Sequence, residues 1–290
     1  MARTASLVLL LFALAGAVRA QQPAAPPADT AQLVEVHLSD GSTLTGRVLA
    51  AGDTSFMLVT PGGLRVQVPR RSLGSWRVVR GVLVGGRLRR ADPNGNRIFF
   101  APTARTLKQG DGYFGDYYLF LPTIGYGLVD RFTITGGMSI IPGVALGDQM
   151  YFIAPKLALV QAPTVSLAAG VMYAGVALGH GGGSGGIAYG VTTLGGEDAA
   201  LTVGLGWPFV VGHGGSKNPW ALFGGELRAS DRLKLLAEVW RFPGASETPG
   251  VFGLRFIGER MGVDFGLMHV FGTHMGSWPF VPWVDFVVHW

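Results

Sequence analysis

The chain has 290 residues, of which 46 are glycine, and 14% are charged while 48% are hydrophobic. This composition is too apolar for a disordered protein and too rich in glycine for a helical bundle. Because cysteine is absent, hydrogen bonds, packing or lipid must hold the fold together in place of disulfides. The composition favours a β-sheet protein with apolar contacts on both faces.

The N-terminus resembles a secretory signal peptide. Arg3 precedes an apolar run over residues 7–15, and small residues suitable for cleavage stand before Gln21. The run is too short for a membrane-spanning helix, which needs ~20 residues. We expect residues 1–20 to be removed on export and residues 21–32, rich in proline and alanine, to form a linker.

Residues 33–80 predict a small β module, which export would place in the periplasm. Short alternating runs are separated by the turn signals Asp40-Gly41, Gly52-Asp53 and Pro61-Gly62-Gly63. Five short strands joined by such turns are consistent with a small SH3-like or Sm-like barrel.

The next stretch, residues 81–95, is predicted to be a basic connector. Beyond the inner membrane such a cluster would normally meet no nucleic acid, so anionic lipid headgroups are the expected partner. A solvated basic face is the alternative that the sequence leaves open. The predicted membrane-surface patch consists of Arg80, Arg87, Arg89, Arg90 and Arg97.

From about residue 96 to residue 290, alternating segments are joined by connections that are short and long in turn. The short turns are predicted at 129–130, 162–163, 196–198, 230–231 and 259–260, and the long connections at 104–112, 142–148, 179–186, 212–218, 243–249 and 272–279. This rhythm is typical of transmembrane barrels. The predicted fold class is all-β, a transmembrane antiparallel β-barrel of about twelve strands, with both ends of the chain in the periplasm.

The alternation within single strands supports this prediction. Leu201, Val203 and Leu205 share one face of their strand, and small residues occupy the other. A soluble β-sandwich would carry lysine, glutamate and serine on its polar face rather than glycine and alanine. A two-residue turn at 259–260 sets a register that opposes Arg255 to Asp264, so we predict an ion pair there.

The C-terminal residues give an independent signal for the outer membrane. Phe286, Val288 and Trp290 share one parity, and the last residue is aromatic. This pattern resembles the signal by which bacterial outer-membrane proteins are recognised for insertion, so the barrel-insertion machinery is an expected partner. The predicted location is the outer membrane of a Gram-negative bacterium.

Two resemblances follow from these residues. Residues 97–290 resemble a family of uncharacterised Gram-negative outer-membrane barrels through 110–113 (GDGY), 126–132 (YGLVDRF) and 284–288 (VDFVV). The likeness covers the final two thirds of the chain and implies fold and location, not an activity. Within the N-terminal module, 40–42 (DGS) and 45–48 (TGRV) resemble Sm-like proteins.

The sequence contains residue patterns found in catalytic and metal sites, but not the structural context or spacing that such sites need. Ser184 lies in a glycine run that spells a nucleophile elbow, but no helix is predicted after it, so no catalytic residue is assigned. Four histidines fall at or beside long connections and could meet at one barrel mouth: His180, His213, His269 and His274. Their scattered spacing favours solvated loop residues over a metal site, and we predict no cofactor.

The inward parity predicts a set of charges inside the barrel. Four are positive and four negative, which favours mutual pairing over a selectivity ring of one sign, with a solute pathway as the alternative. The predicted network consists of Lys156, Glu226, Arg228, Lys234, Glu238, Arg255, Asp264 and Asp285.

The sequence therefore predicts a non-enzymatic outer-membrane barrel. It would act either as a narrow channel for small solutes or as a structural and binding platform. The alternative is an outer-membrane enzyme acting on lipid. Solute, ligand and oligomeric state are not determined by the sequence.

Overall fold

The computed structural model describes residues 25–84, 87–176, 183–272 and 279–290. The chain divides into two compact units, Met1–Leu88 and Arg89–Trp290. Both consist of β-strands, and the helical pieces among the described residues are two 3₁₀ turns, Arg70–Ser72 and Leu146–Asp148. In this part of the chain, no helix has the length and apolar character needed to cross a bilayer.

The first unit contains a five-stranded antiparallel sheet in the order β4-β3-β2-β1-β5. Its core consists of alternate residues such as Val36, Val48 and Leu58, all with no exposed surface. β1 begins at Asp29, so the linker predicted to reach residue 32 is shorter, because the residues after Pro27 again have N–H donors for a ladder. The strands are β1 (Asp29–Leu38), β2 (Thr43–Ala51), β3 (Ser55–Val59), β4 (Arg65–Pro69) and β5 (Leu73–Val78), and β6 (Gly81–Val84) with β7 (Arg87–Arg90) forms a separate two-stranded sheet.

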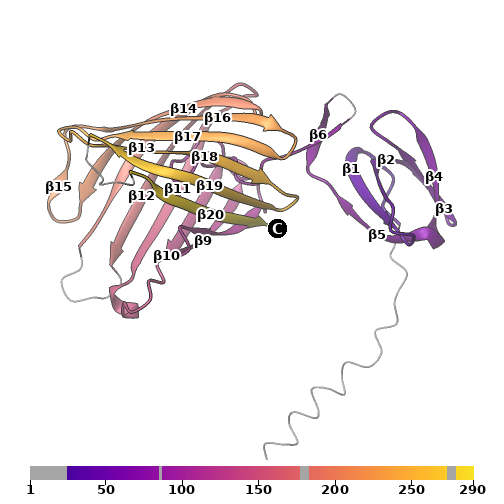
Figure 1. Cartoon of the computed structure of the whole chain (residues 1–290), viewed down its shortest axis with the longest axis horizontal. Helices are drawn as coiled ribbons and strands as arrows, with labels where there is room; N and C mark the ends of the chain where they lie inside the picture. The colour runs from indigo at the N-terminus through magenta and orange to yellow at the C-terminus, as the bar shows by residue number, and fades with distance from the viewer. Residues whose placement is uncertain (1–24, 85–86, 177–182, 273–278) are drawn as a thin grey trace, which may run out of the picture. The chain divides into compact units, whose positions relative to one another are not determined.

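The second unit is a closed antiparallel barrel of 12 strands (Figure 1). Closure follows from two pairings, β8 with β20 and β13 with β14. The strands are β8 (Gly112–Tyr117), β9 (Leu121–Val129), β10 (Phe132–Met138), β11 (Met150–Gln161), β12 (Val165–Val176), β13 (Ser184–Gly195), β14 (Ala199–Val210), β16 (Trp220–Ser230), β17 (Leu233–Arg241), β18 (Thr248–Ile257), β19 (Met261–Phe271) and β20 (Val281–His289); the short β15 (Gly214–Gly215) pairs with β14 outside this count.

The number of strands agrees with the sequence prediction, but the first strand does not. Residues 96–103, predicted to open the barrel, form no barrel strand, and residues 104–112 are not a long external connection. Instead, β8 begins at Gly112 and a turn at residues 118–120 separates it from β9. In this turn Tyr118 and Leu119 have φ angles of 57° and 66°. The turn contains no Gly, Pro, Asn or Asp, so no residue typical of turns marks it in the sequence.

The short turns and the long connections lie at opposite ends of the barrel (Figure 1). The chain's C-terminus lies at the short-turn end, and β15 lies at the long-connection end. We call these two ends the turn end and the loop end.

The outer face of the barrel is apolar. Along β14, exposed and buried residues alternate: Leu201 and Trp207 are 64% and 44% exposed, whereas Ala200 and Thr202 are buried. Similar exposed side chains lie on the other strands, among them Ile124, Leu128, Phe223, Phe252, Phe256 and Phe265. An outer surface of this kind is typical of a barrel that faces lipid.

Candidate functional site

The barrel lumen contains part of the chain itself. Residues 91–111, which we call the luminal segment, precede β8, and Ile98, Phe99 and Ala101 in it have at most 1% exposed surface. The segment folds back on itself through an isolated bridge between Arg97 and Pro102. Its last two residues form backbone hydrogen bonds with Gly127 on β9, and polar contacts to inward-facing side chains hold the rest of the segment in place.

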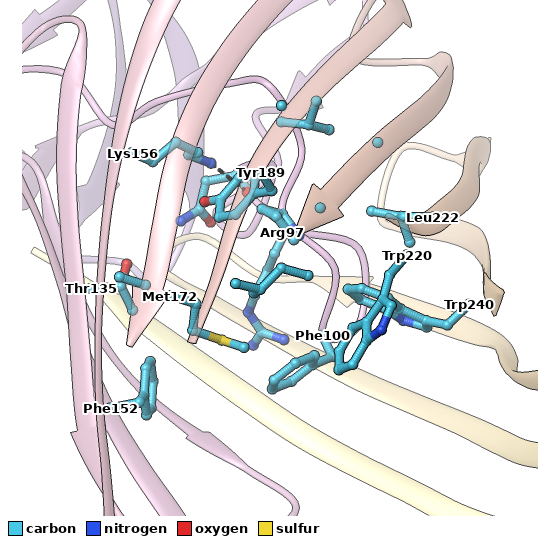
Figure 2. Close-up of a pocket in the computed structure, with 18 of the residues that line it drawn as sticks. Arg97, Phe100, Thr135, Phe152, Lys156, Met172, Tyr189, Trp220, Leu222 and Trp240 are labelled. Carbon is cyan, nitrogen blue, oxygen red and sulfur yellow. Dashed lines mark hydrogen bonds between the residues drawn. The ribbon is translucent and has the colours of Figure 1, made fainter. Parts of the chain in front are cut away.

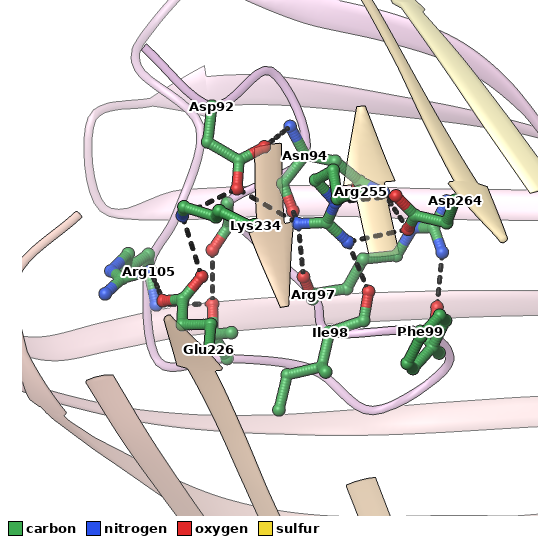
Figure 3. A network of polar contacts seen from close by, with 12 residues as sticks. Asp92, Asn94, Arg97, Ile98, Phe99, Arg105, Glu226, Lys234, Arg255 and Asp264 are labelled. Atoms are coloured by element: carbon green, nitrogen blue, oxygen red, sulfur yellow. Dashed lines mark hydrogen bonds and ion pairs between the residues drawn. The ribbon is translucent and has the colours of Figure 1, made fainter. Parts of the chain in front are cut away.

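The first group of contacts lies near the turn end (Figure 3). Arg255 on β18 donates to both carboxylate oxygens of Asp264 on β19, at 2.8 and 2.7 Å. The two residues are opposed in the ladder, as the predicted register requires. Arg255 also donates to Asp92 of the luminal segment at 3.1 Å and to the carbonyl oxygen of Asn94 at 2.9 Å.

Asp92 is shared by two cations. Its Oδ2 also accepts from Lys234 Nζ at 2.7 Å, and Lys234 donates in turn to Glu226 at 2.9 Å. Burial alone would raise the pKa of the Asp92 carboxyl, but the positive charges of Arg255 and Lys234 outweigh it and hold the pKa well below its usual range. Arg105 of the luminal segment completes the group by pairing with Glu226.

Arg97 anchors the middle of the luminal segment. It forms two parallel hydrogen bonds with Asp285 on β20, at 3.1 and 2.9 Å, and its guanidinium lies 4.1 Å from the centre of the Tyr117 ring. It is 3% exposed, so its predicted place in a membrane-surface patch is wrong. Asp285 is a buried carboxylate on the wall, opposed to Asp264 in the ladder, and without Arg97 it would lack a cation. Pairing inside the lumen is therefore favoured over a position of Arg97 at the membrane surface.

The other arginines of the predicted membrane-surface patch differ in burial and in their partners. Arg90 pairs with Glu259 at 2.9 Å with its side chain 9% exposed, and Arg89 pairs with Asp198 at the turn end. Arg80 is exposed, and the side chain of Arg87 lies outside the described residues.

Glu238 on β17 accepts hydrogen bonds from the turn of the luminal segment. Its Oε2 accepts from the backbone N–H groups of Phe99, Phe100 and Ala101 at 3.0, 3.1 and 3.0 Å. Its Oε1 accepts from Trp240 Nε1 at 3.1 Å. No cation of the described residues pairs with this carboxylate, which is stabilised by four N–H donors.

All eight predicted lumen charges have side chains that are at most 5% exposed, but they do not only pair with one another. Glu226 with Lys234, and Arg255 with Asp264, pair between strands. The other partners include Asp92, Arg97 and Arg105 of the luminal segment, which the sequence prediction had placed outside the barrel. Arg228 pairs at 2.9 Å with Asp198 of a short turn.

Glycines on the inner wall make room for the luminal segment. A Cβ on Gly127 would lie 2.1 Å from the carbonyl oxygen of Lys108, and one on Gly224 would lie 2.1 Å from Ile98 Cδ1. The small inward-facing residues seen in the sequence therefore have a structural reason, which is close approach of a second chain segment.

Two largely apolar cavities lie in the lumen between the luminal segment and the loop end, and Figure 2 shows residues that line the inner one. An inner cavity of about 90 Å³ and a wider one of about 620 Å³ share the lining residues Phe100, Tyr117, Met172, Ile187, Trp220 and Trp240. The charged residues that line them are Arg97 and Lys156 in the inner cavity and Glu238 in the wider one. The wider volume lies within the ~300–1,000 Å³ range of small-molecule sites.

The remaining candidates form no site among the residues that the structure describes. Ser184 begins strand β13 and is not at a strand-to-helix turn. His213 is exposed, and His269 Nδ1 lies 2.7 Å from the Pro279 carbonyl oxygen. His180 and His274 lie outside the described residues, and among those described no cluster of three metal-ligating side chains occurs.

Fold and site together define a closed twelve-stranded antiparallel barrel whose lumen is partly filled by its own chain. No protein-family model and no curated protein matches this sequence. Among solved structures it is similar to the KdgM porin, at 8% identity and a TM-score of 0.42 over 62% of this chain and 95% of that chain. It is also similar to OccK5 of Pseudomonas aeruginosa and to OmpT of Vibrio cholerae, each at 11% identity and a TM-score of 0.32 over 89% of this chain and 95% of the other.

Proposed function

We propose that this chain is an outer-membrane barrel that binds small apolar molecules in the loop-end half of its lumen. The observation that carries the proposal is the cavity of about 620 Å³ lined by Trp220, Trp240, Trp283, Met172 and Met268. Burial of apolar ligand surface contributes ~25 cal/mol per Å², and aromatic and thioether side chains adapt to varied shapes. The apolar outer face, the signal-like N-terminus and the aromatic C-terminus support an outer-membrane location.

Binding is tested by tryptophan fluorescence of the full chain in lipid nanodiscs. Titration with a neutral apolar probe such as decanol should change the emission saturably, because three tryptophans line the cavity. Trp240→Ala should weaken the affinity, whereas Trp207→Ala, on the outer face, should not. A linear response without saturation would mean that the probe only enters the lipid.

A narrow channel is the second candidate, and one observation favours it. Residues 91–109 of the luminal segment are held by side-chain contacts rather than by ladder pairing, so their displacement would break no wall pairing. In planar bilayers we expect low conductance from the wild type and larger openings from the double variant Arg97→Ala/Glu238→Ala. Arg232→Ala, an exposed arginine in a short turn, is the matched control. Equal conductance of all three proteins would rule out gating by this segment.

A further inference from the structure

Lys156 differs from the other charged residues that line the two cavities. Arg97 is neutralised by Asp285, and Glu238 accepts four N–H groups. Lys156 on β11 is 5% exposed, and no carboxylate of the described residues lies within 4.0 Å of its Nζ.

The Lys156 ammonium forms two hydrogen bonds, which leaves one of its three N–H donors without an acceptor among the described residues. The ammonium donates to the carbonyl oxygens of Asn96 and Thr103, each at 2.9 Å. An ammonium has three N–H donors, and a buried cation satisfied only by neutral carbonyls keeps a full positive charge to be matched. An anionic group beside Lys156 would therefore stabilise the charged form of this side chain.

The wall beside Lys156 is suited to a ligand. Tyr189 lines the same inner cavity, and its hydroxyl forms no hydrogen bond with any described residue. Figure 2 shows both residues on the inner wall, with Trp220, Trp240 and Phe100 farther along the lumen. The same lining then continues into the wider cavity toward the loop end.

We propose that the lumen binds a monoanionic amphiphile, with its acidic head at Lys156 and Tyr189 and its apolar chain along Phe100, Trp220 and Trp240. The ligand would supply a negative charge and accept a charge-assisted hydrogen bond, which is stronger than one between neutral groups. This inference rests on the proposed function and adds the chemical class of the ligand to it.

The test compares decanoate with decanol, which has the same chain without the charge, on the full protein in zwitterionic nanodiscs. We expect wild-type protein to bind decanoate at least ~10-fold more tightly than decanol. Lys156→Met should abolish this preference, while Lys156→Arg should keep it. Lys217→Met, which removes an exposed loop lysine, is the matched control.

The outcomes separate the two proposals. Saturable binding of decanol with no preference for decanoate, or a preference that survives in Lys156→Met, would overturn the anionic site and leave the apolar cavity standing. Absence of saturable binding by either probe would overturn both. Because Lys156→Met removes two hydrogen bonds to the luminal segment, the heat-dependent gel mobility of each variant is measured first, and Lys156→Arg provides the result if the methionine variant does not fold.

Discussion

Arg255 connects the barrel wall to the luminal segment. It contacts the carboxylates of Asp92 and Asp264 and the backbone carbonyl oxygens of residues 94, 97 and 98. Arg255→Met leaves the buried carboxylate of Asp264 without its paired cation and Asp92 with Lys234 alone, so we expect a loss of ~3–5 kcal/mol in the free energy of barrel unfolding. Urea unfolding in lipid vesicles measures it, with Arg232→Met as control.

The double variant Arg255→Met/Asp264→Asn tests whether these two residues interact directly. We expect it to be less destabilised than the sum of the single variants, since removing both charges leaves fewer unpaired groups. Additive effects would contradict a buried pair and would indicate a well-hydrated lumen.

Glu238 is expected to fix the turn of the luminal segment. Glu238→Gln removes the negative charge that three backbone N–H groups share, and hydrogen bonds to charged groups contribute ~1.5–3 kcal/mol each. Hydrogen exchange should therefore accelerate at Phe99, Phe100 and Ala101, and amides of the wall strands should keep their protection. Unchanged exchange at these three amides would show that packing alone holds the turn.

The shared carboxylate of Asp92 predicts a dependence on pH. Its pKa is lowered in the fold, so its stabilising contribution is complete above the usual Asp value of ~3.9 and is lost only as the pH falls below that value. The stability difference between wild type and Asp92→Asn should be constant from pH 8 to about pH 5 and shrink at lower pH. A difference that disappears between pH 7 and 6 would contradict this assignment.

At the scale of elements, glycines decide whether the luminal segment fits. Gly127→Ala would force a methyl group against the Lys108 carbonyl oxygen, whereas a Cβ at Gly190 on β13 meets no atom within 4 Å. We expect Gly127→Ala to destabilise the barrel by ~1–3 kcal/mol and Gly190→Ala to have little effect. Equal unfolding midpoints for the two variants would argue against close packing at Gly127.

At the same scale, the strands were predictable and the luminal segment was not. Alternation along β14 and β18 follows from a wall with two different faces, and that pattern is local. The stretch of residues 96–103 is too short for its pattern to show whether it pairs as a strand of the wall or lies inside the lumen. Their position depends on Glu238 and Asp285, which are 139 and 188 residues away from Phe99 and Arg97.

At the scale of the molecule, export and membrane location remain predictions that one experiment can test. We expect the protein to fractionate with the outer membrane and to lack residues 1–20, because the N-terminus has the pattern of a signal peptide. Mass spectrometry of the purified protein gives the N-terminus directly. An intact Met1 on a protein from the soluble fraction would contradict both expectations.

The sequence by itself determined the class of fold, the even strand number and the Arg255–Asp264 register, because strand alternation and short turns act between neighbours in the chain. It also identified eight inward-facing charges, since parity alone assigns them to one face. It could not show that Asp92, Arg97 and Arg105 complete their pairing, because these contacts join distant parts of the chain. Only the tertiary structure decided that the lumen is partly filled, and that Lys156 lies beside an apolar cavity with no ion-pair partner among the described residues.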